Sequence, residues 1–112
     1  MDFFAPASPG AALDYLLFEA SEGDDGVGLF EAMASVEPRR AAAVEAEIAQ
    51  VLAWAETAFP GRRAPVEAGG EWDADLRVEG EGGLAARRTW TLSLCGTPAF
   101  CEAFRERFAG AL

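Results

Sequence analysis

The chain has 112 residues, of which 51% are hydrophobic and 25% are charged, so it is long enough for one core and unlike an intrinsically disordered chain. Its 19 aspartate and glutamate residues outnumber nine arginines, and the formal net charge is -10 at pH 7. This charge repels nucleic-acid phosphates and anionic membrane surfaces, so we expect neither as a partner.

The N-terminal part of the chain predicts a loose arm followed by a β-hairpin. Residues 1–12 are rich in proline and small residues, which is typical of an arm without regular structure. Strands are predicted over residues 13–21 and 27–36, because they flank the acidic, glycine-rich turn sequence SEGDDG. In this hairpin we expect Phe18 to lie opposite Phe30.

Both faces of this first hairpin are largely apolar. Side chains alternate between the two faces of a strand, so the residues on each face can be read from the sequence. One face carries Leu16, Phe18, Ala20, Phe30, Ala32 and Ala34. The other face carries Tyr15, Leu17, Glu19, Leu29, Glu31 and Met33. Helices on one side of a sheet can cover only the first of these faces.

An amphipathic helix is predicted over residues 38–59. Pro38 suits a first helical turn, and Pro60 with Gly61 ends the helix. Trp54 lies beside the apolar stripe, so we expect it at the rim of the core or in a surface contact. The stripe, at steps of three and four, consists of Val44, Ile48, Val51, Leu52, Ala55 and Phe59.

A second hairpin follows the linker of residues 60–70. Strict alternation predicts strands over residues 71–79 and 87–95, each with one buried face. The residues expected to point inward are Trp72, Ala74, Leu76, Val78, Trp90, Leu92 and Leu94.

Opposite charges indicate a register for this second hairpin. If Leu76 lies opposite Trp90, Glu79 meets Arg87 at the turn end of the strands. Opposite charges that face each other across two strands stabilise the pairing. We therefore expect this register.

A second helix is predicted to begin at Thr97 and Pro98, a typical N-cap and first-turn pair. Aromatic residues recur every four positions and form its apolar stripe. They are Phe100, Phe104 and Phe108, joined by Cys101 and, as an optional last member, Leu112.

Together these elements predict one α+β domain over residues 1–112. Its arm is followed by a first ββα unit over residues 13–59, the linker, and a second ββα unit over residues 71–112. We expect the ββαββα order to form a two-layer sandwich, with a four-stranded antiparallel sheet and both helices on one face.

The second apolar face of the first hairpin is the strongest indication of function. Exposed apolar patches of this kind usually mark an interaction site. Three covers are possible: the arm with its hydrophobic pair Phe3 and Phe4, a second copy of the chain, or a different protein. The residues that need a cover are Tyr15, Leu17, Leu29 and Met33.

An acidic strip on the second hairpin is a candidate for metal binding or acid–base chemistry. Its residues are Glu71, Asp73, Asp75 and Glu79. Carboxylate oxygens bind divalent cations, but no converging loop of further oxygen ligands accompanies them. A solvated strand face or a strip that recognises a partner explains the same pattern, and we expect no metal or cofactor.

Two cysteines are too few for a disulfide framework, and they predict reduced thiols in a cytoplasmic protein. Cys95 lies at a strand end before a helix, where the helix dipole would lower its thiol pKa. The chain contains no histidine that could act as its base. Two alternatives to a reactive Cys95 remain open. Cys101 is a buried free thiol on its helix, or Cys95 and Cys101 form a redox pair.

The sequence therefore favours a small acidic protein that acts by binding. The absence of lysine and histidine indicates a GC-rich coding bias that is typical of bacteria. We expect a protein–protein interaction module that forms a homodimer or binds a basic protein, and not an enzyme. The alternative is a metal-binding protein or small-molecule enzyme that uses Asp73, Asp75 and Cys95.

Overall fold

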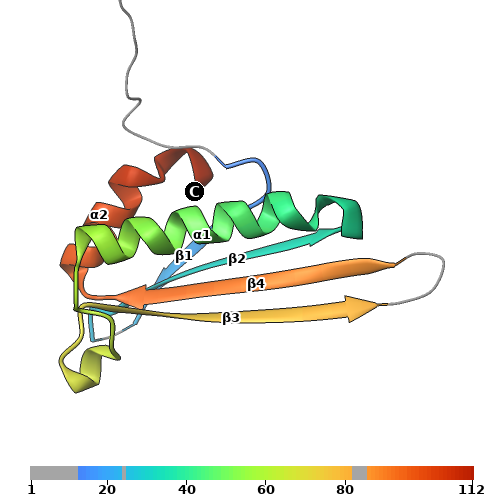
Figure 1. Cartoon of the computed structure of the whole chain (residues 1–112). Coiled ribbons are helices and arrows are strands. Elements are labelled where there is room, and N and C mark those ends of the chain that lie inside the picture. Colours follow the sequence, from blue (N-terminus) through green and yellow to red (C-terminus); the bar gives the residue numbers. More distant parts are fainter. Residues whose placement is uncertain (1–12, 24, 82–85) are drawn as a thin grey trace, which may run out of the picture.

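The structure is a computed structural model that describes residues 13–23, 25–81 and 86–112. They form a four-stranded antiparallel sheet and two α-helices, so the α+β class is confirmed in this general form (Figure 1). The strands are β1 (Glu19–Glu22), β2 (Gly28–Val36), β3 (Trp72–Glu81) and β4 (Arg87–Gly96). The helices are α1 (Ala41–Ala58) and α2 (Pro98–Arg107), with the short 3-10 helices η1 (Pro38–Arg40), η2 (Val66–Ala68) and η3 (Ala109–Ala111).

The sheet has the strand order β1-β2-β4-β3, so pairing of β2 with β4 joins the two hairpins. In the first hairpin Ala20, and not Phe18, lies opposite Phe30. The predicted register is therefore wrong by two residues. Because side chains alternate with a period of two, a shift of this size leaves the paired residues on their predicted faces.

The second hairpin shows the same displacement. Val78, and not Leu76, lies opposite Trp90. The expected cross-strand pairing of Glu79 with Arg87 is therefore wrong as well. In the observed register Arg87 lies opposite Glu81 and Glu79 lies opposite Thr89.

The first strand is much shorter than predicted, because residues 13–18 leave the sheet. The carboxylate of Glu47 on α1 accepts three backbone hydrogen bonds from this segment. The donors are the N–H groups of Asp14, Tyr15 and Leu16, at 2.7, 3.0 and 3.1 Å. The N–H of Phe18 then donates to the carbonyl oxygen of Ala111 at 2.7 Å. The backbone of residues 14–16 and of Phe18 is therefore bonded to the helix side of the molecule.

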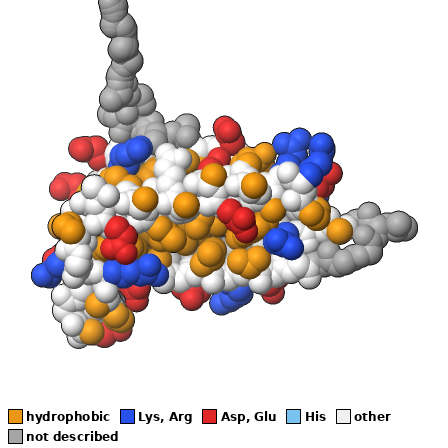
Figure 2. All heavy atoms as spheres, in the orientation of Figure 1, with side chains coloured by type: hydrophobic (Ala, Val, Ile, Leu, Met, Phe, Trp, Pro, Cys, Tyr) orange, Lys and Arg blue, Asp and Glu red, His pale blue; other side chains and the backbone are white. Residues whose placement is uncertain are grey.

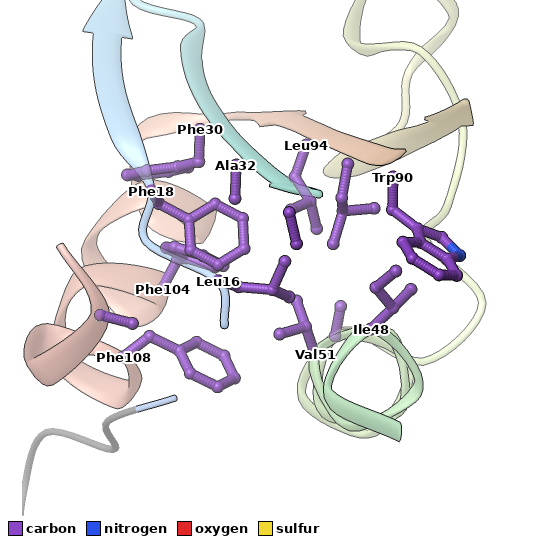
Figure 3. Packing of buried hydrophobic residues seen from close by; sticks show 14 of the residues in the cluster. Leu16, Phe18, Phe30, Ala32, Ile48, Val51, Trp90, Leu94, Phe104 and Phe108 are labelled. Atoms are coloured by element: carbon purple, nitrogen blue, oxygen red, sulfur yellow. The ribbon is translucent and has the colours of Figure 1, made fainter. Parts of the chain in front are cut away.

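The core lies between the sheet and the helices and is rich in aromatic rings (Figure 3). Phe104 of α2 lies at its centre, stacked on Phe30 at 4.3 Å between ring centroids and edge-on to Phe18 at 5.1 Å. The predicted aromatic stripe of α2 is confirmed, since its three phenylalanines are fully buried, but its optional member Leu112 is exposed. Thr97 caps α2 as predicted, because its Oγ1 accepts a hydrogen bond from the N–H of Phe100 at 3.3 Å.

The stripe of α1 is also confirmed. Its buried residues are Val44, Ile48, Val51 and Ala55, while Leu52 and Phe59 are half-buried. Trp54 is half-buried and contacts four aromatic residues, with centroid distances from 5.4 to 6.4 Å. Trp54 therefore joins α1 to α2 and is not free for a separate contact.

The helices cover the middle of the sheet and leave β3 at its edge (Figure 1). Leu76 and Val78 point to the helix side, yet 45% and 50% of their surface is exposed. Their predicted burial is therefore wrong, because α2 covers only the start of β3, where Phe100 stacks on Trp72 at 5.9 Å between ring centroids. Figure 2 shows hydrophobic side chains gathered between α1 and this edge of the sheet.

Candidate functional site

The side of the sheet that faces away from the helices is named the open face here. Three apolar side chains remain exposed on it: Leu17, Leu29 and Met33 are 65%, 39% and 64% exposed. Leu29 and Met33 alternate along β2 with buried residues, and Leu17 precedes β1. Three of the four residues predicted to need a cover are thus together on one surface.

Tyr15, the fourth, is not part of the open face. It is half-buried, packs against the core and accepts a hydrogen bond through its hydroxyl from Arg40 at 3.1 Å. The hydrogen bonds to Glu47 hold the backbone of residues 14–16 above α1 and so remove Tyr15 from the strand pattern. Phe3 and Phe4, the predicted tip of the arm, lie outside the described residues.

A first hollow of about 330 Å³ lies on the open face where β1 meets β2. It is lined by Leu17, Glu19, Glu31 and Met33. Glu31 accepts a hydrogen bond at 3.0 Å from the hydroxyl of Ser93, its partner on β4, and this contact orients the carboxylate. The hollow therefore combines apolar walls with two carboxylates.

A second hollow of about 140 Å³ lies on the neighbouring strands. Its lining combines Leu29 with the carboxyl-bearing residues of β3 and a thiol of β4, because Leu29, Cys95 and Asp73 follow one another across the sheet. The lining residues are Leu29, Asp73, Ala74, Asp75, Ser93, Leu94 and Cys95. Both hollows thus place acidic groups beside exposed apolar surface.

Negative charge predominates over the described residues of the open face. The acidic residues are Glu19, Glu31, Asp73, Asp75 and Glu79, and the basic ones are Arg77 and Arg87. Arg87 is directed to β2, where its guanidinium donates to the hydroxyl of Ser35 at 3.1 Å and to the carbonyl oxygen of the same residue. Strand alternation in the sequence predicted Glu19 and Glu31 on this face, but the pattern did not indicate a function for them.

The predicted acidic strip does not converge on one point. Glu71 precedes β3 and accepts a hydrogen bond from the hydroxyl of Thr97 at 2.7 Å, while Asp73 pairs with Arg63 at 3.2 Å. Asp75 and Glu79 are exposed further along the strand. Among the described residues, no group of three or more histidine, cysteine, aspartate or glutamate side chains could hold a metal ion.

The two cysteines are free thiols in different surroundings. Cys95 is half-buried on the open face, whereas Cys101 is buried on α2 and its thiol donates to the carbonyl oxygen of Gly96 at 3.4 Å. Burial raises the pKa of the Cys95 thiol above its ordinary value, and the Asp73 carboxylate raises it further. The expected lowering of this pKa by the helix dipole is therefore wrong. Burial likewise raises the pKa of Cys101.

This raised pKa predicts slow alkylation of Cys95. At pH 8 we expect iodoacetamide to react with Cys95 several-fold more slowly than with the same chain in urea, because less thiolate is present. Asp73→Asn removes a negative charge, which lowers the pKa and raises the rate, while the remote Glu45→Gln leaves the rate unchanged. Mass spectrometry of the alkylated peptide measures each rate, and an unchanged rate in Asp73→Asn would contradict the role of Asp73.

The geometry thus gives an acidic surface with exposed apolar side chains and two hollows. None of the helices in the described part of the chain has the length and hydrophobicity that a membrane-spanning helix needs. Comparison of the chain with protein-family models, with curated protein sequences and with solved structures gives no match.

Proposed function

We propose that this protein is a binding module whose open face holds a basic, amphipathic segment of another protein. The proposal treats the chain as a two-layer α+β sandwich whose helices cover one side of the sheet, and the partner covers the other. The observation that carries it is the combination of apolar side chains with carboxylates in both hollows of the open face.

The apolar part of the surface provides a driving force for binding. Leu17 and Met33 each expose nearly two-thirds of their surface, and Leu29 exposes more than a third. Complete burial of one such side chain contributes roughly 1.5–3 kcal/mol, so burial of these exposed parts contributes about 3 kcal/mol in total. This contribution is enough to hold a short apolar segment when other contacts direct it.

Charge then distinguishes between the possible partners. Two copies packed open face to open face would bring the carboxylates of Glu19, Glu31 and Asp75 close to one another. Like charges opposed across an interface oppose association, whereas a basic partner would complement them. The net charge of -10 would also attract a basic partner over a distance, and repel a nucleic acid.

The first hollow has the composition that suits a lysine or arginine side chain. Such side chains bury their aliphatic stem along apolar surface and keep the charged end beside oxygen atoms. Leu17 and Met33 would contact the stem, and the carboxylates of Glu19 and Glu31 would receive the charge. A leucine or valine of the partner would fit the smaller second hollow beside Leu29.

Catalysis or metal binding through Asp73, Asp75 and Cys95 is the other function that the sequence suggested. The carboxylate of Asp73 already forms an ion pair with Arg63. The raised pKa of Cys95 favours its weakly nucleophilic thiol form at neutral pH. No observation on the described residues favours this function over binding.

A titration monitored at Met33 tests the proposal. The chain contains only two methionines, so labelling of methionine methyl groups gives one reporter on the open face. We expect a short peptide of alternating lysine and leucine to shift the Met33 methyl resonance, with affinity that falls as salt is added. A double variant, Glu19→Lys with Glu31→Lys, should weaken binding by about tenfold or more.

Two controls make this result specific. Glu45→Lys with Glu56→Lys makes the same change of net charge on the exposed side of α1 and should bind the peptide nearly as well as the natural chain. A peptide of alternating glutamate and leucine should not bind. Equal binding of both peptides would contradict the proposal. A Met33 resonance that moves when residues 1–8 are deleted would instead favour the N-terminal arm as the cover.

A further inference from the structure

The outer edge of β3 is protected over its first residues only. The N–H of Ala64 donates to the carbonyl oxygen of Trp72 at 3.0 Å, and the guanidinium of Arg63 donates to the carbonyl oxygen of Ala74 at 3.2 Å. The N–H of Ala74 donates to the carboxylate of Asp73 at 2.9 Å. The carbonyl group of Trp72 and both backbone groups of Ala74 therefore point away from β4 and are hydrogen-bonded within the chain.

The same strand leaves its second half open to pairing. Because backbone direction alternates along a strand, the N–H and C=O groups of Leu76, Val78 and Gly80 also point away from β4. Among the described residues, none forms a hydrogen bond with these groups. Leu76 and Val78 also expose about half of their surface on the helix side. A long edge strand of this kind is a template for pairing with another strand.

The charges on this segment fit a second copy of the same strand. Arg77 and Glu79 project on the open face, where their neighbours on β4 are the uncharged Thr91 and Thr89. We propose that two copies of the protein pair β3 with β3 in antiparallel fashion, around a two-fold axis at Val78. Each Arg77 then lies opposite Glu79 of the second copy, and the two sheets join into one of eight strands.

Two other symmetric registers fit less well. An axis at Arg77 would place the two arginines opposite each other and Asp75 opposite Glu79 of the second copy, which repel. An axis at Leu76 would require the backbone groups of Ala74, which are already bonded to Arg63 and Asp73. The axis at Val78 forms its hydrogen bonds through residues 76–80 only, whose outer edge no other described residue covers. It joins Arg77 to Glu79 twice at the centre of the interface, and the like charges that it opposes, Asp75 and Glu81, lie at the two ends.

The size of this interface determines how the dimer behaves. Residues 76, 78 and 80 of the two copies would exchange about six backbone hydrogen bonds. Pairing of five residues covers less area than the ~1,200 Å² typical of stable complexes, so we expect a dimer that dissociates on dilution. The inference does not rest on the proposed function. If the dimer and the proposed binding function both hold, the open faces of the two copies lie side by side. A partner with two basic segments then binds more tightly than a partner with one.

Substitutions that reverse the charges of Arg77 and Glu79 test this pairing. Sedimentation of the natural chain should show a mass that rises with concentration from 11.9 kDa toward twice that value. Arg77→Glu and Glu79→Arg should each weaken dimerisation by about tenfold, because each places like charges opposite each other. The double variant restores opposite charges and should return dimerisation to within about threefold of the natural chain.

The sedimentation results distinguish between the possible β3 registers, and between the β3 edge and the open face as the interface. A chain that stays monomeric at all concentrations overturns the proposal. Stronger dimerisation of Glu79→Arg, or no rescue in the double variant, contradicts the register at Val78. A dimer weakened by Leu17→Glu but unaffected by changes at Arg77 and Glu79 would place the interface on the open face instead.

A crosslink measures the axis directly. Residues opposed in a hydrogen-bonded antiparallel pair have Cα atoms about 5.5 Å apart, a separation that a disulfide can span. In a Cys95→Ser background, we expect Val78→Cys to form an intermolecular disulfide on mild oxidation. Leu112→Cys, at an exposed position outside β3, should crosslink far more slowly. Equal rates for the two variants would overturn the pairing at Val78.

Discussion

Phe104→Ala is expected to lower the free energy of unfolding by about 3–5 kcal/mol. Phe104 is fully buried and packs against Phe30, Phe18 and Phe108, at 4.3, 5.1 and 5.0 Å between ring centroids. Removal of its ring leaves a cavity that these neighbours cannot fill without moving from both the sheet and the helix. Urea denaturation followed by tryptophan fluorescence measures the loss, since Trp54 lies 5.9 Å from this ring.

Two control variants test whether the loss of stability in Phe104→Ala arises from the burial of its ring. Phe104→Leu keeps most of the side-chain volume and should lose clearly less stability than the alanine variant. Met33→Ala removes an exposed side chain and should change the free energy of unfolding by less than about 1 kcal/mol. A loss for Phe104→Ala as small as that for Met33→Ala would contradict its central place in the core.

The spacing of apolar residues predicted which side chains form this core. Steps of four placed Phe100, Phe104 and Phe108 on one face of a helix, and all three are fully buried. Strict alternation likewise placed Trp72 and Leu94 on the covered side of the sheet. A period fixes the direction in which a side chain points, so these predictions needed no knowledge of the partner element.

The same alternation could not fix the register. A shift of two residues keeps every side chain on its face, so Phe18 and Ala20 were equally good partners for Phe30. The register in the structure follows from the departure of residues 13–18 from the sheet, which leaves only Glu19–Glu22 to pair. That departure depends on a contact with α1, far away in the sequence.

How far the helices cover the sheet could also not be predicted from the sequence. Leu76 and Val78 follow the pattern of buried strand residues, but burial depends on where the helices cross the sheet. Since α1 lies nearer the middle of the sheet and α2 covers only Trp72 at the start of β3, the rest of this edge strand stays exposed. The pattern alone could not distinguish a side chain that is buried in the core from one that stays exposed on the helix side of an edge strand.

The candidate site was partly predictable for the same reason. Alternation placed Leu17, Leu29 and Met33 on one face, where the structure has them. It could not show that Glu19 and Glu31 form a hollow with them, because this depends on the pairing of β1 with β2. It placed Tyr15 on the same face wrongly, since the contact with Glu47 overrides the strand pattern.

Glu47 therefore determines how the N-terminal segment enters the fold. Its carboxylate is the acceptor for backbone donors of residues 14–16, which would otherwise lie near α1 without a partner. The same segment carries Leu16 and Phe18 into the core, where both are almost fully buried. A single side chain thus supports both the hydrogen bonds and the apolar packing of the segment.

Glu47→Ala is expected to lower the free energy of unfolding by about 2–3 kcal/mol, because hydrogen bonds to a charged group contribute more than neutral ones. Amide hydrogen exchange at Asp14, Tyr15 and Leu16 should become faster than in the natural chain, while exchange in β4 changes only with global stability. Glu45→Ala, on the exposed side of the same helix, should leave both quantities nearly unchanged. Exchange at residues 14–16 that does not respond to Glu47→Ala would show that packing of Leu16 and Phe18 alone holds the segment, and that the carboxylate is dispensable.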